Sequence, residues 1–146
     1  MNMEIRAFNI RIDGDHVPSA DFEILLRFVC EFVVEAGGTE VFREVEFPLV
    51  EFTAQLAEWQ GGGCAGDFDF ESMDSAVRGL VYFHRSDAGA WQVGSTLVGS
   101  PPPRPVTTGE LQRSVEAFLA SVPAAIDPFG VDVRRFLRPK VMGGPA

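Results

Sequence analysis

An alternation of apolar residues over positions 22–35 constrains the fold more than any other stretch of the sequence. Seven apolar side chains occupy every second position there: Phe22, Ile24, Leu26, Phe28, Cys30, Phe32 and Val34. Such a row lies on one face of a β-strand, whereas on a helix it would spiral around the axis. The intervening positions are half apolar, which is typical of a strand near the centre of a sheet. The sequence therefore predicts one long strand over 22–35.

Further strands are predicted on both sides of this one. Residues 4–12 alternate Ile and Phe with Arg and Asn, and residues 39–47 return after Gly37-Gly38 as the second arm of a hairpin. The stretch 67–97 has the pattern of three short strands, with a loop at 72–79 and a tight turn at 87–90. Together these segments predict an antiparallel sheet of about five or six strands.

Three helices complete the predicted fold. Pro48 precedes a helical stripe over 49–60, and three consecutive glycines at 61–63 end it. After the proline triplet at 101–103, Thr107 or Thr108 can N-cap a helix that Pro123 closes, and a last short helix is predicted over 128–137. The predicted class is α+β, with one mid-chain helix and two C-terminal helices. We expect a single domain over 1–138 and a flexible tail over 139–146.

The charge is unevenly distributed. The 146 residues carry a net charge of −9, with 16 acidic residues against 4 arginines in residues 1–76 and 5 acidic against 8 basic residues in the remainder. An acidic surface argues against nucleic acid and anionic membranes as partners, since both require neutralisation of phosphates by Lys or Arg. It suits a basic protein partner, although solubility alone also explains it. Because the sequence has no apolar leader and no long apolar run, we expect a cytoplasmic protein.

Four carboxylates lie close together after residue 66: Asp67, Asp69, Glu71 and Asp74. The first three alternate with phenylalanines, so a strand would spread them along about 13 Å of one face. A metal ion needs ligands that converge within about 2.0–2.6 Å of it, which a straight strand does not provide. We interpret this row as a solvated or partner-binding face, with Glu44 and Glu46 as a second acidic patch, and predict no metal site and no cofactor.

No catalytic motif is present around the two histidines, His16 and His84, because neither the nucleophile elbow nor the zinc-protease pattern occurs. An alternative site is a pocket between the sheet and the C-terminal helices, lined by Tyr82, His84 and Trp91. The sequence leaves open whether Cys30 and Cys64 form a disulfide.

Two segments carry a resemblance to a known group. The run DFDFESMDSAVRGLVYFHRSDAGAWQVGS (67–95) and the helix VEFTAQLAEW (50–59) resemble a family of small, largely actinobacterial proteins of unknown function, over about residues 40–97. The architecture is also similar to immunity proteins of the wall-associated toxin type. That similarity implies an acidic α+β protein that neutralises a basic toxin.

Three functional hypotheses follow. The first is a non-enzymatic binding protein, specifically an immunity-type inhibitor, which contacts a basic protein through Asp67, Asp69, Glu71 and Asp74 and through Glu44 and Glu46. The second is a small-molecule enzyme or binding protein of a bacterial biosynthetic cluster. The third is a homo-oligomeric structural protein that associates through a sheet face or edge.

Overall fold

The computed structural model describes residues 2–73, 78–87 and 89–137. Its regular elements, in chain order, are β1 (Met3–Ile12), α1 (Asp21–Arg27), β2 (Phe28–Ala36), β3 (Thr39–Pro48), α2 (Leu49–Gly61), β4 (Phe68–Glu71), β5 (Arg78–Asp87), β6 (Ala90–Gly94), β7 (Arg104–Thr107), α3 (Thr108–Ile126) and the 3₁₀ segments η1 (Asp127–Phe129) and η2 (Arg134–Leu137).

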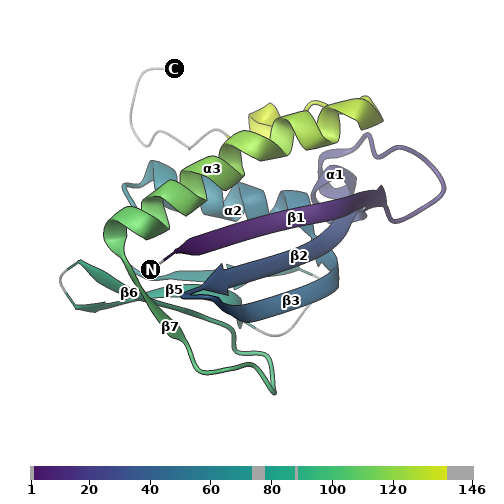
Figure 1. Cartoon of the computed structure of the whole chain (residues 1–146). Helices are drawn as coiled ribbons and strands as arrows, with labels where there is room; N and C mark the ends of the chain where they lie inside the picture. Colours follow the sequence, from purple (N-terminus) through teal and green to yellow (C-terminus); the bar gives the residue numbers. More distant parts are fainter. Residues whose placement is uncertain (1, 74–77, 88, 138–146) are drawn as a thin grey trace, which may run out of the picture.

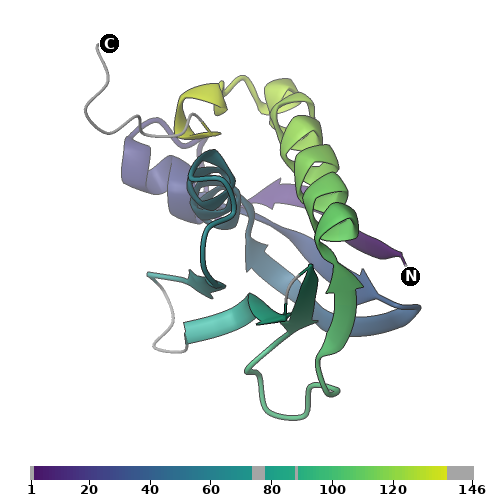
Figure 2. The same ribbon diagram turned by 90° about the vertical axis from the view of Figure 1, so that its left-hand side faces the viewer.

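The α+β class is confirmed, and its strands form two antiparallel sheets. Strands β1, β2 and β3 form the first sheet in that order, and β4 to β7 form the second in chain order. The α2 helix connects β3 of the first sheet to β4 of the second, and these two strands are not paired with each other. Helices α2 and α3 lie on the same side of both sheets (Figures 1 and 2).

The predicted strand over 22–35 is wrong in its first half. Residues 21–27 form α1, and β2 begins only at Phe28. Strand β1 ends at Ile12 opposite Phe28, so residues before Phe28 have no strand to pair with. The chain closes this corner with a hydrogen bond from the Asp13 N–H to the Arg27 carbonyl, 2.7 Å. On α1, Ile24 is buried whereas Phe22 is 62% exposed. The alternating apolar residues of this segment therefore do not lie on one face of the structure.

One aromatic ring joins the main parts of the core. Phe52 of α2 lies 4.9 to 5.9 Å, between ring centroids, from five other phenylalanines. Two of them belong to the first sheet, two to the second and one to α3; they are Phe32, Phe47, Phe68, Phe70 and Phe118. The apolar stripe predicted for 49–60 is therefore confirmed as the face that packs against both sheets.

The C-terminal region begins as predicted and then differs from prediction in two details. Thr107 is the N-cap of α3 and accepts a hydrogen bond from the Glu110 N–H, 3.2 Å, as its sequence position suggests. Pro123 lies inside α3, which continues to Ile126, so the prediction that it ends the helix is wrong. The helix predicted over 128–137 is divided into η1 and η2, because Gly130 adopts a left-handed conformation with φ +80° between them.

Each edge strand carries a feature that opposes the addition of another strand. Strand β1 has a bulge at Phe8–Arg11, and its Met3 carbonyl accepts a hydrogen bond from Ser114 of α3, 2.6 Å. Strand β3 also has a bulge, and β7 is four residues long and contains Pro105. The edge of β4 is occupied by the side chain of Gln55 of α2.

Candidate functional site: an acidic cleft at the end of β3

The acidic row on β4 is largely used within the protein. Asp67 accepts a hydrogen bond from the Arg85 N–H, 2.8 Å, and thereby extends the pairing of β4 with β5. Asp69 forms a hydrogen bond with His84, with 2.8 Å between Oδ1 and Nε2. Asp74 lies outside the described residues. The structure therefore gives Asp67 and Asp69 structural partners that the sequence pattern does not reveal.

Helix α2 binds the end of β4 through two polar side chains. Gln55 donates to the Glu71 carbonyl, 2.6 Å, and accepts from the Glu71 N–H, 3.1 Å, much as a neighbouring strand would. Glu51, only 3% exposed, accepts from the Ser72 hydroxyl, 2.8 Å, and from the Met73 N–H, 2.9 Å. The sequence analysis did not predict this pair of contacts, which we call the α2 clamp. The only sequence signal for it is a glutamate and a glutamine at i and i+4, on the same face of a helix.

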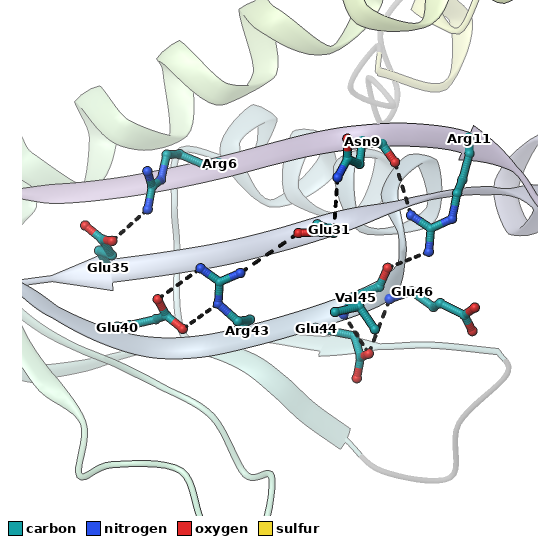
Figure 3. A network of polar contacts seen from close by, with 10 residues as sticks. All are labelled: Arg6, Asn9, Arg11, Glu31, Glu35, Glu40, Arg43, Glu44, Val45 and Glu46. Atoms are coloured by element: carbon teal, nitrogen blue, oxygen red, sulfur yellow. Dashed lines mark hydrogen bonds and ion pairs between the residues drawn. The ribbon is translucent and has the colours of Figure 1, made fainter.

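The second acidic patch lies where β3 departs from regular pairing. The register of β2 with β3 shifts between Cys30 and Phe32. At this bulge Glu44 Oε1 accepts the backbone N–H groups of Val45, 2.8 Å, and Glu46, 3.3 Å. Figure 3 shows Glu44 and Glu46 together at the end of β3 distant from Glu40.

These two glutamates line a cleft of about 400 Å³. Asp13, from the turn after β1, supplies a third carboxylate to its lining. The apolar lining comes from α1, from both sheets and from the loop after β6, through Leu26, Val29, Phe42, Leu80 and Leu97 among others. Asp13 was not predicted as a site residue, because its sequence context indicates only a turn.

The nearby arginines donate elsewhere, within the part of the chain that the structure describes. Arg11 donates to the carbonyls of Asn9, 3.1 Å, and Val45, 2.6 Å (Figure 3). Arg27 lies 3.6 Å from Glu23. Among the described residues, no ion pair involves Asp13, Glu44 or Glu46. The cleft thus combines an apolar interior with three carboxylates that form no ion pair within the described part of the chain.

The rest of the exposed face of the first sheet is internally paired (Figure 3). Arg6 binds Glu35, 2.7 Å, and Arg43 binds Glu40, 2.7 Å. The hydrogen bond from Arg43 holds the pKa of the Glu40 carboxyl below its usual value. Val33 lies opposite both arginines in the sheet and is 0% exposed, so their aliphatic stems cover it.

The structure does not bring the three residues of the alternative pocket together. Tyr82 and His84 stack with 4.1 Å between ring centroids, on one face of the second sheet. Trp91 lies opposite Arg85 in the pairing of β5 with β6, which places it on the other face. It is 1% exposed, packs 5.6 Å from Trp59 and donates to the Thr108 hydroxyl, 3.0 Å. Trp91 is a core residue here.

Both cysteines are free and buried. Burial raises the pKa of the Cys30 thiol to about 12 and also raises that of Cys64. A buried thiol with a raised pKa is a poor nucleophile, so neither cysteine has the surroundings of a reactive one.

Two negative findings apply to residues 2–73, 78–87 and 89–137. Within these ranges no three His, Cys, Asp or Glu side chains gather closely enough to hold a metal ion. No described helix has both the length and the apolar character that a membrane crossing requires.

A second groove, of about 370 Å³, lies between α1, α2 and η2 and includes Glu51, Glu58 and Arg135 in its lining.

Comparison with known proteins identifies a family. The model of the family described as "Domain of unknown function (DUF7878)" matches residues 8–127, and the chain therefore belongs to this family. The match extends well beyond the stretch 40–97 that carries the resemblance noted in the sequence. No curated protein and no solved structure matches the chain.

Proposed function

We propose that this member of the DUF7878 family is a non-enzymatic protein-binding domain that captures a basic partner protein. The observation that carries the proposal is the cleft at the end of β3. Asp13, Glu44 and Glu46 line an apolar depression there and form no ion pair among the described residues. A surface that presents both carboxylates and apolar area suits a partner that carries basic and apolar groups.

The overall charge supports the same type of partner. A net charge of −9 creates a negative field that accelerates the approach of a basic protein and sets its orientation. The same field repels nucleic acid and anionic membranes. We therefore propose a protein rather than a phosphate-rich polymer as the ligand.

The strand edges favour recognition by side chains. Addition of a partner strand needs a free row of backbone N–H and C=O groups. Gln55 occupies such groups on Glu71, and bulges interrupt β1 and β3. We propose that the partner binds to the side chains of the cleft and does not extend either sheet.

The specific form we propose is an immunity-type inhibitor of a basic toxin. A toxin and its inhibitor are made together, so the product of the adjacent gene is the direct test. The wild-type chain should form a 1:1 complex with that protein, and the affinity measured by titration calorimetry should fall steeply with salt.

Two double variants with equal charge change provide the control. Glu44→Gln with Glu46→Gln should weaken the complex by about tenfold or more, because hydrogen bonds to charged groups contribute about 1.5–3 kcal/mol. Asp67→Asn with Asp69→Asn should leave the affinity within about twofold. Equal losses for the two variants, or no dependence on salt, would show that the cleft is not the contact surface.

A further inference from the structure

We infer that the cleft at the end of β3 receives a single arginine side chain of the partner protein. This inference rests on the proposed function and specifies what the partner must present. It follows from two properties of the cleft: its apolar interior and the carboxylates in its lining.

The interior suits the aliphatic part of a long cationic side chain. Leu26, Val29, Leu80 and Leu97 contribute to the lining, and Leu97 is 42% exposed. The methylene stems of Arg and Lys pack along apolar surface while the charged group remains at the mouth. The arginines of this protein do the same on the first sheet, where the stems of Arg6 and Arg43 cover Val33.

The carboxylates suit the charged group. Glu44 is held in place because its Oε1 accepts the N–H groups of Val45 and Glu46. Within the described residues its Oε2 has no hydrogen-bond partner, and Glu46 and Asp13 add two more carboxylates to the same lining. A guanidinium presents five donors in a planar arrangement and can therefore contact more than one of these groups.

Arginine fits this site better than lysine. The guanidinium is more weakly hydrated than an ammonium, so it loses less solvation when it enters a partly apolar cleft. An ammonium has three donors on one atom and is more strongly hydrated, so it loses more solvation in such a cleft. Three carboxylates around apolar walls therefore select arginine.

Three capped amino acids test the inference: the N-acetyl, N-methylamide derivatives of arginine, lysine and citrulline. Citrulline keeps the shape of arginine and lacks its charge. Methyl NMR of the wild-type chain should show shifts at Leu26, Val29, Leu80 and Leu97 on titration with the arginine derivative. Citrulline should bind at least about tenfold more weakly, because its hydrogen bonds are not charge-assisted, and lysine should rank between them.

Matched variants define the site. Glu46→Gln should reduce the affinity for the arginine derivative several-fold, whereas Glu116→Gln, an equal charge change on the exposed side of α3, should leave it unchanged. Equal binding of arginine and citrulline, equal binding of arginine and lysine, or shifts confined to other methyl groups would overturn the inference.

The inference and the proposed function fail in different ways. If the product of the adjacent gene binds and the arginine derivative neither binds nor competes, the arginine contact is wrong and the proposed function stands. If the derivative binds in the cleft and the adjacent product does not bind to the chain, the arginine site stands and the proposed toxin partner is wrong.

Discussion

The two acidic patches of this protein have similar sequences and different environments. Asp67, just before β4, and Asp69 within it alternate with phenylalanines, and on β3, Glu44 and Glu46 alternate with Val45 and Phe47. The β4 carboxylates accept a backbone N–H and bind a histidine from the neighbouring strand. The β3 carboxylates line an open cleft and are not neutralised by described cations. The number of acidic residues in a stretch therefore does not tell which of them are free to meet a partner.

The difference arises from the neighbours that the fold supplies. The groups that occupy the β4 row come from β5 and from α2, 15 to 18 residues away in sequence. Near the β3 patch, Arg11 donates to the backbone carbonyls of Asn9 and of Val45, which lies in the bulge. At this bulge Glu44 accepts the N–H groups of Val45 and Glu46, and Arg11 donates to the Val45 carbonyl and forms no ion pair with the described carboxylates of the patch.

The largest effect is expected from a substitution at Glu51, which holds the end of β4 in place. Replacement Glu51→Ala removes the acceptor for the Ser72 hydroxyl and the Met73 N–H at a site that is 3% exposed. Loss of two hydrogen bonds to a buried carboxylate should lower the free energy of unfolding by about 2–4 kcal/mol, measured by urea titration. The control is Glu58→Ala, two turns further along the same helix and exposed, which should change stability by about 0.5 kcal/mol or less. Similar stabilities for the two variants would refute the stabilising role of the Glu51 hydrogen bonds.

Intermediate effects are expected when one carboxylate of each acidic patch is replaced by alanine. Asp67→Ala should lower stability by about 1 kcal/mol through the lost hydrogen bond to the Arg85 N–H, and should leave partner affinity unchanged. Glu46→Ala should do the opposite, with stability altered by about 0.5 kcal/mol or less and partner affinity reduced. Thermal unfolding and titration calorimetry on the same preparations measure both quantities. If the two variants gave the same pattern, the distinction between the patches would be lost.

The smallest expected effect concerns pH and the paired carboxylates of the first sheet. The pKa of Glu40 is lowered in the folded state, first by the hydrogen bond from Arg43. Folding is therefore stabilised by this pair above the ordinary glutamate pKa, about 4.3, and the stabilisation is lost as the pH falls through the lower folded-state value. Glu40→Gln should make the acid side of the stability profile shallower, and high salt should reduce the difference from wild type. An unchanged profile would contradict the role of the pair; Glu116→Gln is the matched control.

Regular elements with strong local signals were predictable. The helix after Pro48 was predicted over 49–60 and spans Leu49–Gly61, and Thr107 serves as the expected N-cap of α3. The error at 22–35 has a nonlocal cause. The alternation there is real, and it forms a strand only where β1 offers a partner, which is from Phe28 onward.

The site was less predictable than the fold. Glu44 and Glu46 were identified as an acidic patch from their spacing, and a β-bulge and a cleft cannot be derived from that spacing. Asp13 joins them only because the turn after β1 lies next to β3 and α1 in space. Gln55 and Glu51 act on residues about 16 to 22 positions away, so their roles depend on how α2 packs against β4.

The position of Phe52 has a consequence for how the protein unfolds. The two sheets share no strand, and an architecture of that kind could in principle melt in two steps. The ring of Phe52 touches phenylalanines of both sheets and of α3, so loss of either sheet exposes the aromatic surface of the other. The domain should therefore behave as one cooperative unit, in which the slowest exchanging amides of β2 and of β5 open together.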